Sequence, residues 1–529
     1  MKPVYKNTTL LFLVLLLVAC AQLPQNVVRT PSRHIHVTDT TTTTGLGRAI
    51  APMRAQHKDE SGIYSLDEGL DAFFARLALI DAVEKSLDVQ YYIWHNDNTG
   101  RLLLYNILLA ADRGVRVRIL LDDINSVDIE PQMQIVDRHP NIEVRLFNPF
   151  AARSFRSIDF ITRFSEVNRR MHNKTFTGDS QVSIIGGRNI GDEYFQARPD
   201  LDFGDLDVVA VGPVVEDISH AFDLYFNSET VIPISAFDNN RATDAELTAL
   251  RKSLGVFYLQ MQSSEYAVRL RKTRIAEQLL GGDLPYAWGQ AHIFYDHPDK
   301  ARGKSEQETE YLLPQLAPVV EEVKEELLLI SPYFIPGDEG VDFLSSLVKR
   351  GVRVRILTNS LAANDVSIVH SGYSRYRMAL LEAGIELFEL KPGRKPLKKS
   401  HSSVSRSSRA SLHAKSFVFD RKKIFVGSLN LDPRSIDINT EIGLLIEVPQ
   451  LAKKFSDWFD SEMPEQAWRL QRLRLPANEE EGRDFDEYII RWHEQHGDKR
   501  ISYDEEPKVS VWKQFIVWLY SLLPVESQL

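Results

Sequence analysis

Apolar and polar positions follow the same order of patterns twice along the chain. In the first half, a strand pattern, a helical spacing and two further strand patterns occupy residues 86–94, 102–114, 115–123 and 142–149. In the second half, the same order returns at residues 326–336, 341–351, 352–360 and 385–392. The octapeptide RGVRVRIL is identical at 113–120 and 350–357, an offset of 237. A repeat of this length indicates an internal duplication.

Each repeat has strand–helix–strand order, which predicts crossover connections and a mostly parallel sheet covered by helices. The fold class is therefore α/β. Arginines alternate with Val and Ile in both copies of the octapeptide, at Arg116 and Arg118 and at Arg353 and Arg355. Charged residues in a strand commonly protect an exposed edge. We expect these arginines to lie at a solvated edge or in structural ion pairs, without a catalytic role.

The 529 residues are enough for two to four domains. A hydrophobic content of 43% and a charged content of 26% are ordinary for a folded body. The formal net charge of −10 argues against a general nucleic-acid binder, which usually carries a basic surplus. Cys20 is the single cysteine of the sequence, so no intramolecular disulfide is expected.

The N-terminal residues have the pattern of a secretory signal. Lys2 and Lys6 precede an apolar run over 10–19, and Cys20 follows directly. Ten apolar residues are too few to span a bilayer, which needs about 20. Residues 17–20, LVAC, resemble the lipobox of bacterial lipoproteins, in which the cysteine is lipidated and becomes the mature N-terminus. The alternatives are a short uncleaved anchor, or a plain signal with an incidental cysteine.

The lipobox resemblance implies a lipid-anchored protein of the bacterial cell envelope that faces the periplasm. Ala21, where an Asp would favour the inner membrane, points to the outer membrane. The expected organisation is a signal peptide at 1–19, a flexible tether at 20–60, a first domain at 61–235, a helical connector at 236–305, a second domain at 306–470 and a C-terminal extension at 471–529. The extension carries a candidate membrane-interfacial helix at 511–524, whose alternative is a closing helix packed on the domain.

The two halves also share a polar motif. The first half reads MHNKTFTGDSQVSIIGGRN and the second LHAKSFVFDRKKIFVGSLN. At a constant offset of 241, His172, Lys174, Asp179, Gly186 and Asn189 correspond to His413, Lys415, Asp420, Gly427 and Asn430. One such pattern would be weak, because these residue types are common. Two in the same register of a duplication are a strong signal.

His and Lys two positions apart on a strand point to the same face. If the halves meet face to face, two imidazoles flank a pocket lined by two lysines. This arrangement suits a phosphodiester, because in-line attack needs a nucleophile on one side and a proton donor on the other. The lysines would offset charge on the non-bridging oxygens. The sequence around the motifs calls for no metal and no other cofactor.

These residues resemble the paired HKD motifs of the phospholipase D superfamily, and the resemblance covers residues 61–468. LDVQYYIW, RLFNPF, RRMHNKTFT, GGRNIGDEYF, TNSLAANDV and SLHAKSF are similar to bacterial cardiolipin synthases of the C type. The resemblance implies two tandem homologous α-β-α sandwich domains with the active site at their pseudo-twofold interface. It also implies a phosphohistidine intermediate on one half, while the histidine of the other half protonates the leaving alcohol and then activates the acceptor.

By resemblance, His172 is the nucleophile and His413 the acid–base, although the sequence itself leaves this symmetry open. The resemblance assigns the phosphoryl oxygens to Lys174, Lys415, Asn189 and Asn430, with Ser428 as support. Asp205 and Glu441 occupy equivalent places before later strands and are the candidates to orient the histidines. Their alternative is a carboxylate at the surface end of a strand. We expect Asp179 and Asp420 to support the fold of the motif.

Three reactions share this chemistry: transfer of a phosphatidyl group onto phosphatidylglycerol to give cardiolipin, transfer to water, and cleavage of nucleic acid. The resemblance favours the first, with phosphatidylglycerol and phosphatidylethanolamine as candidate donors. The signal and the net charge disfavour nucleic acid. A membrane surface is the expected partner, and the basic stretch 391–409 could draw anionic headgroups or be a loop without a role. The sequence leaves the oligomeric state open.

Overall fold

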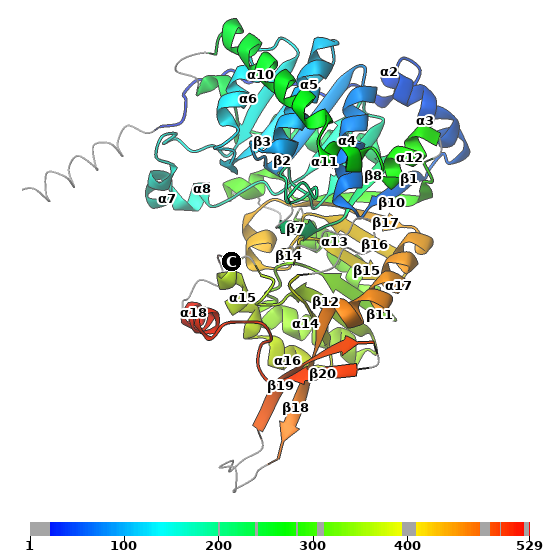
Figure 1. The fold of residues 1–529 in the computed structure, drawn as a ribbon, viewed down its shortest axis with the longest axis vertical. Coiled ribbons are helices and arrows are strands. Elements are labelled where there is room, and N and C mark those ends of the chain that lie inside the picture. The colour runs from blue at the N-terminus through cyan, green and yellow to red at the C-terminus, as the bar shows by residue number, and fades with distance from the viewer. Residues whose placement is uncertain are drawn as a thin grey trace, which may run out of the picture.

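The computed structural model describes residues 22–198, 201–237, 242–281, 284–303, 311–364, 366–393, 409–476, 487–497, 499–522 and 528. Figure 1 shows two halves stacked along the long axis, with the N-terminal half above and the C-terminal half below. A ribbon of strands projects from the lower end.

The first half is built on one mixed sheet. Its strands lie in the order β1 (Ser61–Leu66), β8 (Asp207–Val211), β6 (Val182–Gly186), β5 (Thr175–Gly178), β2 (Ser86–Ile93), β3 (Arg116–Asn125), β4 (Ile142–Phe147) and β9 (Val231–Pro233). β2, β3 and β4 pair in parallel and the other neighbours antiparallel. The expectation of a mostly parallel sheet is therefore wrong, because the β5–β6 hairpin and the flanking strands are antiparallel.

The second half repeats this order strand for strand. Its sheet contains β10 (Ala287–Tyr295), β17 (Ile442–Glu447), β16 (Lys423–Gly427), β15 (Ser416–Phe419), β11 (Glu326–Ile330), β12 (Arg353–Asn359), β13 (Glu386–Leu390) and β18 (Ala467–Leu475). β19 (Glu487–His496) and β20 (Lys499–Tyr503) extend it beyond β18 and form the projecting ribbon in Figure 1. The tandem duplication inferred from the octapeptide is confirmed.

Two strand pairings join the halves. β1 pairs antiparallel with β10, with Gly62 opposite Trp288, so the two sheets meet edge to edge. A Cβ at Gly62 would lie 2.9 Å from the Trp288 ring, so this seam has little room for a side chain at Gly62. A separate parallel pair, β7 (Leu201–Gly204) and β14 (Arg409–Leu412), also takes one strand from each half.

Helices cover both faces of each sheet. The first half contains α2 (Val37–Thr41), α3 (Gly45–Gln56), α4 (Gly69–Ala82), α5 (Asn98–Asp112), α6 (Glu130–Val136), α7 (Asp159–Thr162), α8 (Phe164–Val167), α9 (Val214–Phe226), α10 (Asp244–Gln262), α11 (Glu265–Leu270) and α12 (Arg274–Gly281). The second half contains α13 (Leu312–Glu321), α14 (Gly337–Lys349), α15 (Ser367–Ser374), α16 (Arg377–Glu382), α17 (Pro449–Gln466) and α18 (Val511–Ser521).

Most buried apolar residues fall into three layers of core. The outer layer of the first half lies between its sheet and α4, α5 and α10. The outer layer of the second half lies between its sheet and α13, α14 and α16. The middle layer contains residues of both sheets together with α9 and α17, so it is shared between the halves. Each half is thus an α-β-α sandwich, and the two are packed through a common core.

The repeated octapeptide is a helix stop followed by a central strand. Gly114 and Gly351 have φ of 95° and 91°, a left-handed conformation that glycine adopts without strain. In the first copy, Gly114 N donates to Ala111 O and Val115 N to Ala110 O, the two bonds of a Schellman motif. In the second copy, Gly351 N donates to Val348 O and Val352 N to Leu347 O. The sequence RGV is needed twice because α5 and α14 end in the same way.

The arginines of the octapeptide are partly as expected. Arg118 is 1% exposed on β3, an interior strand, and its guanidinium binds Asp88 at 2.7 Å and Asp223 at 2.7 Å. Arg355, also 1% exposed, binds Glu326 at 2.7 Å. The ion pairs are present, but the solvated edge is wrong for these two positions, because both strands have neighbours on each side.

The flexible tether expected over 20–60 is wrong for the described residues. α2 and α3 form within this segment, and the side chains of Thr40 and Thr44 are fully buried. His34 Nδ1 lies 2.8 Å from Asp223 Oδ2 on α9, and Gln181 Nε2 donates to Val37 O at 2.9 Å. Residues 40–44 are all threonine and lack apolar periodicity, yet the hydroxyls of Thr40 and Thr44 donate to the helix backbone, and the Thr40 hydroxyl accepts from Gln181. The segment is packed on the first half.

The helical connector expected over 236–305 does contain α10, α11 and α12, which pack on α4 and α5 of the first half. Its last third is different. β10 is the first strand of the second sheet and the partner of β1, so the second half begins before residue 306. Likewise, β18 crosses the expected boundary at 470 and continues into the extension. Across the described parts of the chain, no helix combines the length and the apolar character that a membrane span requires.

Candidate active site

The backbone of each motif lies against the other half of the chain. His172 N donates to Thr440 O at 2.8 Å, directly before Glu441. His413 N donates to Gly204 O at 2.8 Å, directly before Asp205. Each motif is therefore aligned with the residue that precedes a carboxylate of the opposite half. Both histidines lie just before a strand, β5 or β15, in the loop that faces the other sheet.

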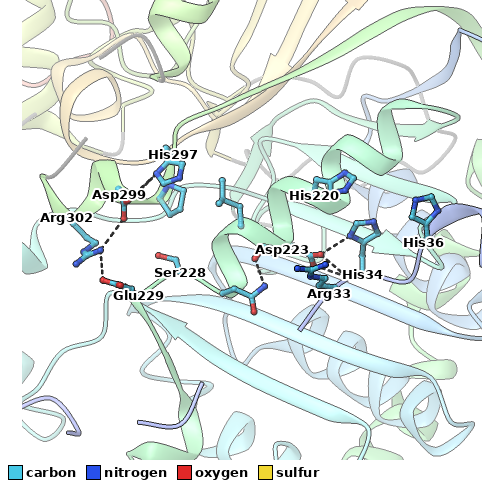
Figure 2. Close-up of a pocket in the computed structure, with 13 residues that line it drawn as sticks. Arg33, His34, His36, His220, Asp223, Ser228, Glu229, His297, Asp299 and Arg302 are labelled. Atoms are coloured by element: carbon cyan, nitrogen blue, oxygen red, sulfur yellow. Dashed lines mark hydrogen bonds and ion pairs between the residues drawn. The ribbon is translucent and has the colours of Figure 1, made fainter. Parts of the chain in front are cut away.

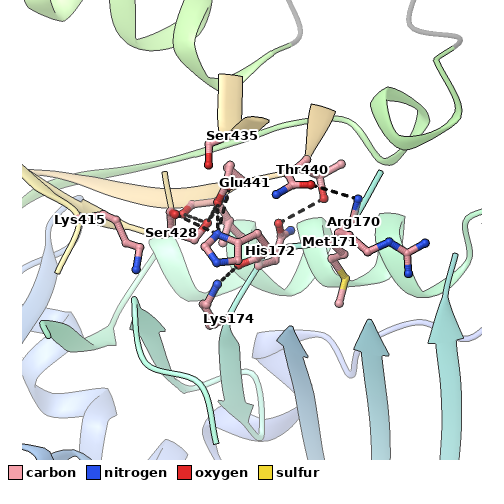
Figure 3. A network of polar contacts seen from close by, with 12 residues as sticks. Arg170, Met171, His172, Lys174, Lys415, Ser428, Ser435, Thr440 and Glu441 are labelled. Atoms are coloured by element: carbon pink, nitrogen blue, oxygen red, sulfur yellow. Dashed lines mark hydrogen bonds and ion pairs between the residues drawn. The ribbon is translucent and has the colours of Figure 1, made fainter. Parts of the chain in front are cut away.

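His172 contacts a carboxylate from the second half. Its Nδ1 atom lies 2.9 Å from Oε2 and 3.1 Å from Oε1 of Glu441, and 3.1 Å from Ser428 O. The Glu441 side chain is fully buried. Figure 3 shows the carboxylate directed at one edge of the imidazole, while Lys174 approaches from below. Because Nδ1 is occupied, Nε2 is the ring nitrogen left for a substrate.

His413 repeats this contact in reverse. Its Nδ1 atom lies 2.5 Å from Oδ2 of Asp205, which belongs to the first half and is 5% exposed. The two pairs are crossed: each imidazole comes from one half and its carboxylate from the other. The structure thus brings His172, His413, Asp205 and Glu441 together, as the sequence expects.

Two buried lysines complete the cluster. Lys174 and Lys415 are each 1% exposed. Lys174 Nζ donates to His172 O, and Lys415 Nζ lies 2.9 Å and 3.1 Å from the two ring nitrogens of His413. Burial lowers the pKa of Lys174 well below its usual value, against the attraction of Glu441, and nearby Lys415 lowers it further. An anionic ligand between these groups would relieve this mutual repulsion.

The two carboxylates differ electrostatically. Burial raises the pKa of Glu441 to about 7, although Lys174 and the Ser428 hydroxyl act against this. Burial also favours the neutral form of Asp205, but His413 and Lys415 beside it lower its pKa below the usual range. Both histidines have lowered pKa values, first because of burial and then because of the lysines, and the effect is large at His172. The site therefore holds His172 neutral and places a fully ionised carboxylate beside His413.

Comparison with known proteins agrees with this duplicated site. Residues 77–223 and 318–463 match the family "Cardiolipin synthase, PLD-like domain". The chain belongs to the cardiolipin synthase type of the phospholipase D superfamily. Cardiolipin synthase C of Escherichia coli (strain K12) is 43% identical over 91% of this chain and 99% of that protein.

More distant members of the superfamily match a shorter part of the chain. Cardiolipin synthase A of Pseudomonas fluorescens is 26% identical over 72% of this chain and 64% of that protein. Among solved structures, phosphatidylserine synthase of Haemophilus influenzae Rd KW20 aligns with a TM-score of 0.55 at 13% identity, over 92% of this chain and 100% of that chain. This likeness concerns the fold, and it confirms the tandem phospholipase D-like architecture.

The HKD aspartates lie away from the histidines. Asp179 accepts hydrogen bonds from the backbone N–H groups of Glu84, Lys85 and Ser86, at 2.7 to 3.0 Å. Asp420 accepts the equivalent three bonds from 324–326, also at 2.7 to 3.0 Å. Both have positive φ at the turn of a hairpin. In this phospholipase D fold they fix the start of the neighbouring strand, β2 or β11, to the motif.

The remaining predicted residues take different places. Asn189 is 1% exposed, and its amide bonds Ile93 N and Tyr194 OH. Asn430 is 6% exposed, and its buried Oδ1 has no hydrogen-bond partner among the described atoms. The Ser428 hydroxyl donates to Glu441. Ser428 therefore contacts the carboxylate, whereas its first-half counterpart is Gly187, where a Cβ would lie 2.2 Å from Asp205 Oδ1.

Sequence reasoning missed the second layer of contacts around Glu441. Glu441 N donates to Asp296 Oδ2 at 2.8 Å, and Lys300 Nζ lies 3.0 Å from the same carboxylate. Both residues are at most 1% exposed. They come from the expected connector, which has no motif that marks them. Aromatic rings were also missed: Tyr92 lies 4.9 Å from the His172 ring, and Tyr194 lies 5.2 Å from the His413 ring.

Some expectations fall outside the described residues. The signal sequence with Cys20 and most of the basic stretch, 394–408, are not described. Within the described part of the chain, no cluster of three or more His, Cys, Asp or Glu residues could hold a metal ion.

A separate cavity of about 660 Å³ lies between the N-terminal segment, α9 and the end of β10. Figure 2 shows His34, His36 and His220 on one side, and His297, Asp299 and Arg302 on the other. Its charged groups are largely paired with one another, as in His34 with Asp223 and Arg302 with Glu229. None of the HKD residues lines this cavity.

Proposed function

We propose that this chain is a phosphatidyltransferase that makes cardiolipin by transferring a phosphatidyl group onto phosphatidylglycerol. The observation that carries the proposal is the crossed pair of buried histidines, each bound to a carboxylate of the opposite half, with two buried lysines between them. The 43% identity to a cardiolipin synthase over 91% of the chain supports the choice of reaction.

In the first step, His172 Nε2 attacks the phosphorus of the donor phospholipid. A P–N bond forms, the P–O bond to the headgroup alcohol breaks, and His413 gives that oxygen its proton. The donor's phosphatidyl group is then held as a phosphohistidine. Lys174 and Lys415, with Asn189 and Asn430 behind them, offset the charge on the non-bridging oxygens, so no metal or cofactor takes part.

In the second step, a hydroxyl of phosphatidylglycerol enters the position that the alcohol has left. His413, now neutral, takes its proton; the new P–O bond forms as the P–N bond breaks, and His172 returns to its neutral state. The products are cardiolipin and the alcohol released first. With phosphatidylglycerol as donor that alcohol is glycerol, and with phosphatidylethanolamine it is ethanolamine.

Electrostatics supports this division of roles. A nucleophile must be neutral, and burial together with the two lysines lowers the pKa of His172 well below its usual value. A general acid must be able to hold a proton; burial and then Lys415 lower the pKa of His413, and the ionised Asp205 carboxylate, 2.5 Å away, acts against this. Asp205 and Glu441 would orient the rings through Nδ1, and Asp179 and Asp420 would support the motif from behind.

Hydrolysis to phosphatidic acid is the alternative, since water can replace the acceptor. The side chains of His172 and His413 are only 9% and 11% exposed, and aromatic rings lie against both. Restricted access for water favours transfer to a second lipid. A nuclease is disfavoured by the net charge of −10.

We place the enzyme at a bacterial membrane, in keeping with its lipid substrates. Cys20 would be the lipidated anchor, with the folded body facing the periplasm and Ala21 favouring the outer membrane. This location gives the enzyme phospholipid on one side and keeps it away from the nucleic acid of the cytoplasm.

The deciding experiment incubates the purified full chain with phosphatidylglycerol, with and without phosphatidylethanolamine, and separates the lipids formed. Cardiolipin with released glycerol or ethanolamine supports the synthase and identifies the donor. Phosphatidic acid as the only product would show that the enzyme is a hydrolase and not a synthase. Cleavage of DNA without any change in the lipids would exclude both lipid reactions. The matched control is His413→Ala, which should form none of these products.

A further inference from the structure

The last helix of the chain exposes its apolar side. Among the residues of α18 and its C-cap, Val511, Trp512, Phe515, Trp518, Leu519 and Leu522 are 47 to 81% exposed. At 3.6 residues per turn these six positions fall within an arc of about 120°. We call this arc the α18 face. A helix on the surface of a globular protein normally presents polar residues to water, so α18 is inverted.

The opposite side of α18 attaches it to the second half. Val517 is 7% exposed, and Lys513 Nζ donates to Leu361 O at 2.6 Å. The exposed rings are ordered among themselves, with Trp512 and Trp518 each 5.7 Å from Phe515. The side of α18 that contacts the second half thus carries one buried apolar residue and the Lys513 bond, whereas most of its large apolar side chains face outward.

A second apolar patch lies in the first half. Phe155, Phe160, Ile161 and Phe164, in and around α7 and α8, are 37 to 85% exposed, and we call them the α7–α8 patch. Together with the α18 face, it holds more than half of the exposed large apolar side chains that the structure describes. Contiguous exposed apolar area on a folded protein marks an interaction surface.

The two surfaces lie on the same side of the molecule. Figure 1 shows α7 and α8 on the left of the upper half and α18 on the left of the lower half. Gln528 Oε1 accepts from Asn168 Nδ2 at 2.8 Å, directly after α8. Gln528 is seven positions after Ser521 in the sequence, so the end of α18 lies within about 25 Å of this contact.

Both surfaces are connected to the histidines through short paths. His172 follows the end of α8 by five residues. On the other side, Leu361 receives the α18 lysine two residues after Asn359, and Asn359 makes two hydrogen bonds of 2.9 Å with the backbone of Leu412, next to His413. One surface thus belongs to each catalytic motif, and the junction between the halves lies between them.

We propose that the α18 face and the α7–α8 patch together dock the enzyme on a lipid bilayer, with the paired histidines above the headgroups. This inference rests on the proposed function, which requires two lipids to reach one buried phosphoryl site. Trp and Phe on the outward arc suit the headgroup region, where aromatic rings accumulate. α18 has 11 residues, so it lies in the interface and does not cross it.

A bilayer fits these surfaces better than a second copy of the chain. The α18 face and the α7–α8 patch lie on separate halves but on one side of the molecule, so a broad flat partner such as a bilayer surface can contact both at once. A helix-in-groove contact with another protein would need only the α18 face and would leave the α7–α8 patch in water. None of the six residues of the α18 face is charged, whereas a specific protein interface has a polar rim that fixes its register.

The first test measures contact by tryptophan quenching in the full chain. The chain has seven tryptophans, of which Trp512 and Trp518 lie on the α18 face. Vesicles of brominated phosphatidylglycerol should quench the wild type, and Trp512→Phe with Trp518→Phe should remove most of this quenching. The control is Trp458→Phe, on α17 at the other side of the lower half in Figure 1, which should leave it unchanged. Equal quenching of the double variant and the wild type would overturn docking by α18.

The second test separates docking from chemistry. Trp512→Glu with Trp518→Glu, and separately Phe155→Glu with Ile161→Glu, should lower the rate on phosphatidylglycerol vesicles about tenfold or more. On a short-chain phosphatidylglycerol dispersed as monomers, the same variants should keep wild-type rates. Val256→Glu with Leu259→Glu, which removes exposed apolar side chains from α10, is the matched control and should match the wild type on both substrates.

The outcomes distinguish this proposal from the proposed function. If the wild type makes cardiolipin and the glutamate variants do so equally well on vesicles, the docking surface is wrong and the function stands. If the wild type is quenched by vesicles but forms no cardiolipin, the function is wrong and the docking stands. Sedimentation of the wild type as a dimer that Trp518→Glu dissociates would assign the α18 face to a second copy, against our proposal.

Discussion

The Nδ1 atom of His172 lies 2.9 Å from Oε2 of Glu441, although the two residues come from opposite halves of a duplicated chain. The partner contact, between His413 and Asp205, is crossed in the same way. Neither half contains a complete pair. Each half contributes one histidine and one carboxylate, and each histidine takes its carboxylate from the other half. The next two predictions concern this exchange.

Glu441→Gln should lower turnover by about 10²–10⁴, because an amide no longer fixes the tautomer and charge of His172. Burial raises the pKa of Glu441 to about 7, so wild-type activity should rise with pH through about 7 as the carboxylate ionises. The variant should lack this acidic limb. The measurement is the pH profile of kcat on phosphatidylglycerol micelles. An acidic limb of unchanged position in the variant would exclude Glu441 as its source.

The same pKa has a consequence for stability. The folded state binds the Glu441 proton more tightly than the unfolded chain, in which a glutamate titrates near 4.3. The contribution of Glu441 to stability should therefore fall as pH rises from about 4.3 to about 7. The difference in the free energy of unfolding, Glu441→Gln minus wild type, should therefore rise by about 2–4 kcal/mol between pH 5 and pH 8. Urea unfolding at the two pH values measures it. A pH-independent difference between the two proteins would contradict this.

The roles of the histidines can be separated by the leaving group. His172→Ala should be inactive on every substrate, because no P–N bond can form. His413→Ala should be inactive on phosphatidylglycerol, but should release 4-nitrophenol from a phosphatidyl 4-nitrophenyl ester, whose leaving group needs no proton. The measurements are nitrophenolate absorbance and labelling of the protein by phosphorus-labelled lipid. Rescue of His172→Ala in place of His413→Ala would reverse the assignment.

The sequence predicted most of the side chains that meet between the two halves, but not the contacts that hold them there. A constant offset of 241 identified His172 and His413 because the duplication fixes equivalent positions. Asp296 carries no such signal in the sequence. It accepts a hydrogen bond from Glu441 N only because the end of β10 lies beside Glu441 in the folded chain. The sequence did not predict β10, because apolar and polar residues alternate only weakly over its nine positions. The strand forms where β1 offers an edge to pair with.

Asp179→Ala should lower the free energy of unfolding by about 2–4 kcal/mol, since it leaves three backbone N–H groups at the start of β2 without an acceptor. Asp420→Ala should cost less, because Asp420 is partly exposed to water whereas Asp179 is fully buried. Asp81→Ala, an exposed acid at the end of α4, is the control and should change stability by less than about 0.5 kcal/mol. Urea unfolding checks all three, and a larger loss for Asp420→Ala would contradict this ranking.

The N-terminal segment should depend on Asp223. Burial favours the neutral form of Asp223, but His34 and Arg118 lower its pKa, so the contact stabilises the fold above pH about 4 and is lost as pH falls through the folded pKa. Asp223→Asn should increase amide hydrogen exchange over residues 32–41 at pH 7. Glu216→Gln, which loses only the exposed contact with His36, should have little effect. Unchanged exchange in Asp223→Asn would show that the segment is held by other contacts.

The β1–β10 seam gives the crossed pairs a common weak point. A small displacement of one sheet along the other would lengthen both histidine–carboxylate contacts at once, because each spans the boundary. A compound bound between Gly62 and Trp288 would therefore disturb both histidines together without touching either. An inhibitor of this kind would compete with neither lipid, and a resistant variant would have to restore the registration of two sheets.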